Sequence, residues 1–420
     1  MRRFAALLVS VWMVAGCGAV GSPTTGTPSG SPPATGPAWE VRAAPGIVND
    51  ATSVDGTIVA VGSTAPTAAS PIGVAAAWAS LDGKTWDAAP VDGSASQMMA
   101  VARGPRGFVA VGNGGPSGDG PVVWTSDDGR SWTAVPGSTA FEPAQGCAST
   151  SLADVAAGPG GFAAVGVEWG DCGQHGSAWF SPDGRPWTRA PSATGGNSTQ
   201  VIIATDAGYI AAGAADASAN EGMRAAFWWS PDGRAWTLAP DEIDFHGAQP
   251  AALAATASGF TAVGSAIQAQ ALLPAQWRSN DGQSWERVQA AGLSDVSAGG
   301  PGDPTGEQRA PMALAGELLV ANDGLVATGA ATTVPVGSSG EEIPQWRLIV
   351  WISATGDGWT RLPDDAALEL GASSAFSQGP TAVVAHGGRL ILFGSLPDGG
   401  ADAARTWEAD LGAVLAYPGG

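Results

Sequence analysis

The chain has 420 residues, of which 44% are hydrophobic and 18 are tryptophan, so it can bury a large core and is not a disordered polypeptide. Its 38 acidic and 18 basic residues give a formal net charge of −20. This balance argues against nucleic acid as a partner, because neutralising phosphates requires clustered lysine and arginine.

The first residues have the pattern of an export signal. Arg2 and Arg3 precede an apolar stretch from Phe4 to Ala15, which is too short to span a bilayer. It ends in "VAGC", which resembles the lipobox of bacterial lipoproteins and implies cleavage before a lipidated Cys17. Residues 1–16 are then the signal peptide, and the protein is held at the extracytoplasmic face of the cell membrane. The alternative is an ordinary secretory signal with an accidental cysteine.

Residues 17–36 are rich in Gly, Ser, Thr and Pro and cannot bury apolar surface, which predicts a flexible tether. The folded body is expected over residues 37–412, followed by a short tail at 413–420.

A seven-residue motif recurs along the folded body as SLDGKTW, SDDGRSW, SPDGRPW, SPDGRAW and SNDGQSW, with a weaker copy, SATGDGW, at 353–359. Asp-Gly is a strong hairpin-turn signal, and serine and aspartate side chains can cap the backbone N–H groups of such a turn. The motif therefore predicts a stapled hairpin turn. Its structural aspartates are Asp82, Asp128, Asp183, Asp232 and Asp281.

A second recurring element is a short apolar strand that ends in glycine, as in "GFVAVG" and "GFAAVG". Its seven copies end at Gly62, Gly112, Gly166, Gly213, Gly264, Gly329 and Gly394, 47 to 65 residues apart. With an apolar run before each copy and a hairpin after it, each unit has four strands, and the period is that of propeller blades.

The two ends of the body complement each other. The last unit has a third-strand Trp407 but no outgoing strand, and "PAWEVRAAP" around Trp39 has the pattern of one. We therefore expect an all-β protein, a monomeric seven-bladed β-propeller of four-stranded antiparallel blades, closed by the N-terminal strand.

The motif resembles the Asp-box, or BNR, repeat of the sialidase-like superfamily, in a version one residue shorter between aspartate and glycine. The resemblance extends over residues 37–412. Asp-box propellers include sialidases, other glycoside hydrolases, and non-catalytic proteins such as photosystem II assembly factors and sorting receptors. The resemblance therefore implies the fold and leaves the activity open.

Two cysteines lie in the longer connections on the face opposite the predicted turns. Cys147 and Cys172 are symmetric about the turn at 158–161, which in an exported protein favours a disulfide. Metal ligation by Cys147, Cys172 and His175 is the alternative, although no CxxC spacing supports it. No metal site and no cofactor are predicted.

Aromatic and acidic residues gather in the same connections and suit a sugar or a cationic ligand, although a loop folded over its own tryptophan is the alternative. The predicted ligand-binding residues are Phe141, Glu142, Glu168, Trp169, Asp171, His175, Asp241, Asp244, Phe245 and His246.

A sialidase site needs three converging arginines and a tyrosine nucleophile. Tyr209 has the sequence position of core residues, and Arg130, Arg185 and Arg234 follow the turns on the other face. We predict no catalytic residue, and His386 is expected to be structural. The sequence favours a non-catalytic propeller whose loop face binds a glycan or a protein partner. The alternatives are a glycoside hydrolase and an assembly or scaffold factor for a membrane complex.

Overall fold

The computed structural model describes residues 36–65, 73–93, 97–114, 120–136, 139–191, 196–216, 223–240, 245–268, 271–293, 309–321, 324–335, 345–372, 379–396 and 403–417. Residues 36–420 form one compact unit. The predicted signal peptide, Cys17 and most of the tether lie outside the described residues. No helix in the described part of the chain is long and apolar enough to cross a bilayer.

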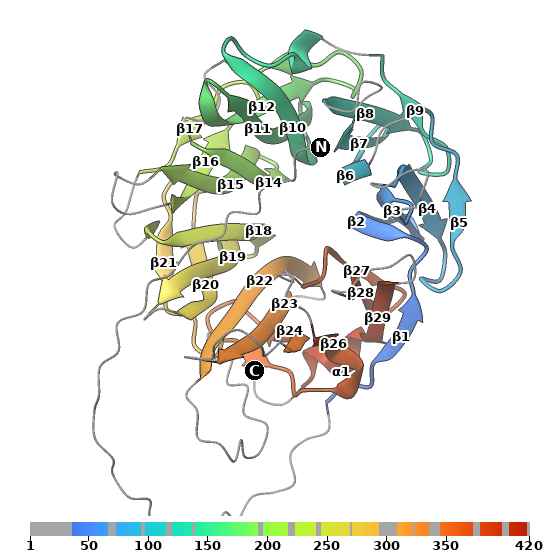
Figure 1. The fold of residues 1–420 in the computed structure, drawn as a ribbon, viewed down its shortest axis with the longest axis vertical. Coiled ribbons are helices and arrows are strands. Elements are labelled where there is room, and N and C mark those ends of the chain that lie inside the picture. Colours follow the sequence, from blue (N-terminus) through green and yellow to red (C-terminus); the bar gives the residue numbers. More distant parts are fainter. Residues whose placement is uncertain are drawn as a thin grey trace, which may run out of the picture. The chain divides into compact units, whose positions relative to one another are not determined.

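Seven small antiparallel sheets form a ring, with the first strand of each innermost (Figure 1). Blades 1 to 4 are β2 (Ile47–Val54), β3 (Thr57–Ser63), β4 (Ala75–Ser80), β5 (Asp87–Ala89); β6 (Gln97–Gly104), β7 (Gly107–Asn113), β8 (Pro121–Ser126), β9 (Thr133–Ala134); β10 (Cys147–Gly158), β11 (Gly161–Gly170), β12 (Gly173–Ser181), β13 (Thr188–Arg189); and β14 (Ser198–Thr205), β15 (Gly208–Asp216), β16 (Met223–Ser230), β17 (Thr237–Leu238).

Blades 5 to 7 are β18 (Ala248–Thr256), β19 (Gly259–Gln268), β20 (Ala271–Ser279), β21 (Glu286–Val288); β22 (Arg309–Ala321), β23 (Gly324–Pro335), β24 (Gln345–Ser353), β25 (Thr360–Arg361); and β27 (Ala382–His386), β28 (Arg389–Ser395), β29 (Ala404–Asp410), β1 (Glu40–Ala43). The short β26 (Glu369–Ala372) adds to β24. The helical segments are η1 (Thr139–Phe141), η3 (Ala366–Leu368) and α1 (Leu411–Leu415), so the predicted tail begins inside a helix.

The predicted closure is confirmed. β1 pairs antiparallel with β29, and Val41 lies opposite Trp407. The first and last blades are also joined by His386, whose ring nitrogens lie 2.9 Å from the Ser53 hydroxyl and 3.0 Å from the Leu81 carbonyl oxygen. The histidine is therefore a structural link at the seam of the ring.

In blades 1 to 5, one glycine of the second strand is required by close packing inside the blade. At Gly62 a Cβ atom would lie 1.9 Å from the Ile47 carbonyl oxygen, and at Gly166 one would lie 2.0 Å from that of Ser151. The neighbouring first strand has a bulge at this level, which brings its backbone against the glycine.

The serine and aspartate of the repeated motif bind the backbone of their own turn. In blade 4, the Ser230 hydroxyl accepts from Gly233 N at 2.9 Å, and Asp232 accepts from Arg234 N at 2.8 Å. Trp236 closes the turn by donating to the Gly233 carbonyl at 3.1 Å. The third-strand tryptophans, Trp124, Trp179, Trp228, Trp277, Trp351 and Trp407, are fully buried.

Candidate functional site

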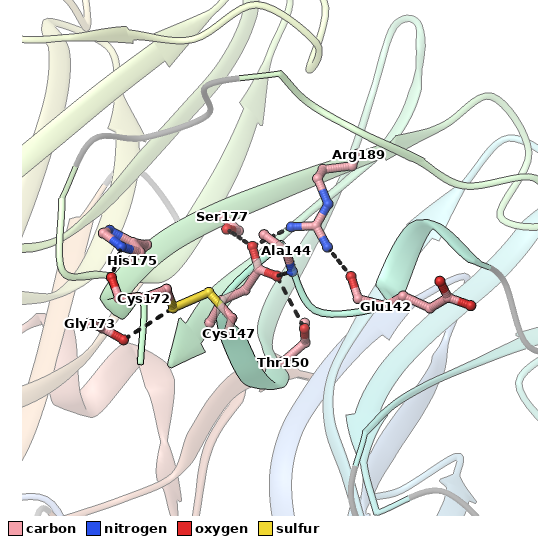
Figure 2. Close-up of a disulfide and its surroundings, with 10 residues drawn as sticks. Glu142, Ala144, Cys147, Thr150, Cys172, Gly173, His175, Ser177 and Arg189 are labelled. Atoms are coloured by element: carbon pink, nitrogen blue, oxygen red, sulfur yellow. Dashed lines mark hydrogen bonds and ion pairs between the residues drawn. A yellow bond between two sulfur atoms is a disulfide. The ribbon is translucent and has the colours of Figure 1, made fainter. Parts of the chain in front are cut away.

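Blade 3 carries a disulfide at the tip of a long arm. Its first three strands have 12, 10 and 9 residues, against 8, 7 and 6 in blade 2. The extra residues extend β11 and β12 to a tight hairpin between Gly170 and Gly173. Cys172 at this tip bonds to Cys147 at the start of β10, with Cα atoms 4.9 Å apart (Figure 2).

The disulfide prediction is thus confirmed. The alternative, a metal site using both thiolates, is wrong for this state, because sulfur atoms in a disulfide are not available as thiolate ligands. Among the described residues, no group of three or more His, Cys, Asp or Glu side chains is arranged to hold a metal ion.

Glu168 lies beneath the arm as a buried and fully bonded carboxylate. It accepts hydrogen bonds from Ala144 N at 2.8 Å and the Ser177 hydroxyl at 2.7 Å, and it pairs with the guanidinium of Arg189. Arg189 in turn donates to the Glu142 carbonyl, so the carboxylate fastens the 142–147 segment to β11, β12 and β13 (Figure 2). Its role is structural.

The electrostatics of Glu168 support this role. Burial acts to raise its pKa, but hydrogen bonds from the Ser177 hydroxyl and the Arg189 guanidinium outweigh burial and hold the pKa below its ordinary value. A carboxylate that stays ionised and has its oxygens occupied is a poor proton donor or nucleophile.

Four of the predicted residues on this arm face solvent. Trp169 keeps 39% of its surface exposed, and Glu142, Asp171 and His175 are exposed as well. His175 lies opposite Glu168 in the register of β11 and β12, so its side chain is on the other face of the hairpin from Trp169. The His175 ring folds back onto the Cys172 carbonyl. The arm therefore presents an exposed aromatic ring on a cross-linked hairpin, and a ring held in this way can anchor a ligand.

The other predicted residues do not join this group. Phe141 is buried 5.7 Å from the Trp179 ring centroid, and Phe245 is buried 5.8 Å from that of Phe227. Both rings fill the core between blades and offer no surface to a ligand. His246 is half-buried at the bridge between β16 and the next linker, away from blade 3. Asp241 and Asp244 lie outside the described residues.

Three carboxyl groups nearer the centre of the ring were not predicted. Asp50, Asp154 and Glu317 occupy one equivalent position, directly after the bulge in the innermost strands β2, β10 and β22. Asp50 accepts from Val101 N of the next blade at 2.8 Å. Asp154 likewise accepts from Ile202 N at 2.8 Å. The signal was an acidic residue inside an apolar strand, as in "SLADVAAG".

The pKa values of these groups are raised. Burial, assisted by the charge of Asp154, raises the pKa of Asp50 to about 7. Burial raises the pKa of Asp154 to about 6. Burial, together with the charges of Asp50 and Asp154, raises the pKa of Glu317 well above its ordinary value. Glu317 accepts no hydrogen bond from the described residues, so no donor offsets the effect of burial.

No family model matches the sequence, and no curated protein matches it. Among solved structures, the chain is similar to a Trypanosoma rangeli sialidase, with 12% identity over 88% of this chain and 54% of that one and a TM-score of 0.41. The chain thus spans about half the length of that sialidase.

Two other solved structures have comparable values. A phage phi92 endosialidase has 12% identity over 89% of this chain and 69% of that one, with a TM-score of 0.46. The polysaccharide lyase Uly1 has 10% identity over 88% of this chain and 91% of that one, with a TM-score of 0.49. All three are carbohydrate-active proteins by name, and identities this low say nothing about the activity of this chain.

Proposed function

We propose that this protein is a non-catalytic, lipid-anchored propeller that binds a glycan or a protein partner through the face carrying the blade 3 arm. The observation that carries the proposal is the exposed Trp169 on a hairpin that the disulfide and the Glu168 network hold in place. Rigid aromatic side chains in such settings dominate binding energy. Lipid attachment through Cys17 would keep the propeller at the extracytoplasmic face of the membrane.

A glycan array and cross-linking in intact cells test this binding with the full chain. Trp169→Ala should weaken capture of the ligand at least about tenfold, as expected for an aromatic anchor. Ile267→Ala is the matched control, because Ile267 is an apolar side chain with 54% exposure on another blade. If both variants lose ligand capture equally, or if neither loses it, the proposed surface is contradicted.

Membrane attachment is tested separately. Cys17→Ala should release the protein from the membrane fraction and abolish incorporation of labelled fatty acid. A Cys17→Ala variant that stays in the membrane fraction, or that still incorporates the labelled fatty acid, would contradict the lipobox.

A glycoside hydrolase remains the second candidate because of Glu317, a carboxyl group with a raised pKa that could act as a general acid. A panel of fluorogenic glycosides tests it. Turnover that Glu317→Gln abolishes and Trp169→Ala preserves would favour the hydrolase over the binding protein.

A further inference from the structure

The tip of the blade 3 arm brings two exposed side chains together on one face of the hairpin. In the register of β11 and β12, Trp169 lies directly opposite Gln174, which places their Cβ atoms about 5 Å apart. Both side chains are exposed. The neighbouring pair in the register, Glu168 and His175, lies on the other face. Trp169 and Gln174 therefore form a small surface that is distinct from the Glu168 network.

This surface continues the face with which blade 3 packs on blade 4. Val165 of β11 and Ala178 of β12 form a pair on the same face, and both are buried against blade 4. Trp169 and Gln174 lie four residues nearer the tip on the same two strands, where the side chains are exposed. The disulfide cross-links this end of the hairpin, so a ligand that binds here orders little additional chain.

The fold does not use the polar atoms of this pair. Within the described residues, neither the indole N–H of Trp169 nor the side-chain amide of Gln174 makes a hydrogen bond. The amide offers two donors and an acceptor, and the indole offers one donor. An apolar ring beside such groups is complementary to a pyranose, because a pyranose has an apolar C–H face and hydroxyl groups around its edge.

The charges of the arm disfavour an acidic ligand. Residues 161–177 contain no Lys or Arg, and Arg189 beside them is paired with Glu168. Glu142 and Asp171 are exposed and acidic, in a chain with a formal net charge of −20. A carboxylate on the ligand would therefore be repelled, and residues 161–177 would offer no cation to pair with it.

We propose that Trp169 and Gln174 bind one ring of an uncharged glycan. The indole stacks on the C–H face of the sugar, and the Gln174 amide bonds to hydroxyl groups at its edge. Glycans that carry sialic acid or a uronic acid are excluded by charge. This inference rests on the proposed binding function of the arm and narrows its ligand to one chemical class.

A glycan array probed with the full chain sorts the captured glycans by charge, and it should show capture of neutral oligosaccharides and not of sialylated or uronate-containing ones. The affinity for the best captured neutral oligosaccharide is then measured by NMR, using the indole ¹⁵N peak that Trp169→Phe removes. Gln174→Ala should weaken this affinity at least about threefold, because hydrogen bonds to the sugar are lost. The affinity should not change between about 0.05 and 0.5 M salt, since no ion pair forms.

Gln283→Ala is the matched control, because Gln283 is an exposed glutamine in a turn of blade 5, and this variant should bind like the parent. The inference is wrong if no glycan is captured, if acidic glycans are captured in preference, or if Gln174→Ala binds like the parent. A protein partner captured through Trp169, without any glycan, would overturn this inference and leave the proposed function intact. If Trp169→Ala changes no capture at all, the proposed function fails as well.

Discussion

At the scale of single residues, Asp50 and Asp154 use their carboxylates to bind backbone N–H groups that the ring leaves unpaired. The innermost strand of each blade is a sheet edge. Its N–H groups that do not face the second strand need other acceptors. A carboxylate placed after the bulge reaches the next blade and supplies one. The sequence showed the acidic residues, but a bulge has no signature that would have revealed where their side chains point.

The raised pKa of Asp50 predicts a dependence of stability on pH. The folded protein holds this proton up to about pH 7, whereas the unfolded chain releases it near the ordinary aspartate pKa of 3.8. Stability from this group is therefore fully present below pH 3.8 and is lost as pH rises through 7. The loss is at most about 1.4 kcal/mol per pH unit, and less because water reaches the half-buried carboxyl.

Urea unfolding between pH 4.5 and 8 measures this effect, and Asp50→Asn should flatten the curve because the amide does not titrate. Asp55→Asn is the control, since that aspartate is exposed in the neighbouring turn. A parent and an Asp50→Asn variant with the same pH slope would disprove the assignment.

The turn serine is a second residue with a defined contribution. Ser230 is buried, and Ser230→Ala would leave the Gly233 N–H without its acceptor. We expect a loss of about 1–3 kcal/mol in the free energy of unfolding. Ser258→Ala, at an exposed position, should change it by less than about 0.5 kcal/mol. Denaturant titration of both variants makes the comparison.

At the scale of elements, the blade 3 arm shows what could and could not be predicted. The disulfide followed from two cysteines placed symmetrically about a hairpin turn, because antiparallel pairing brings such positions together. Phe141 and Phe245 were expected to bind ligand, but both rings are buried. Each lies in a polar linker, but the linker turns inward. Phe141 packs against Trp179 and Trp187, and Phe245 packs against Phe227. Sequence polarity does not report that inward turn.

The disulfide should stabilise the arm locally more than the ring. Cys147→Ser with Cys172→Ser opens a loop with a sequence separation of 25, worth up to about 3 kcal/mol by chain entropy and less here because the hairpin already closes the loop. Hydrogen exchange of residues 142–148 should accelerate in the double variant, while Glu168 still anchors the segment. Exchange that is unchanged there, or accelerated equally in blade 5, would contradict this local role.

At the scale of the whole molecule, the blade count and the closure were both readable from the sequence, since each blade repeats the same strand and turn signals. The first and last repeats were incomplete in complementary ways. What the repeat could not show is where blades differ, and one such difference creates the arm on blade 3. Function in such a ring resides in departures from the repeat.

Closure itself gives the last prediction. A chain that starts at Gly46 lacks β1, so the edge of β29 loses its partner and the half-buried Trp39 no longer covers blade 7. Relative to a chain that starts at Gly36, we expect a loss on the order of 3 kcal/mol, from a few ladder hydrogen bonds at about 1 kcal/mol each. The exposed edge should also promote association, measured by light scattering. Among the described strands, β1 is the one through which the N-terminal segment joins the last blade. A monomeric shortened chain of unchanged stability would therefore mean that the ring does not depend on this closure.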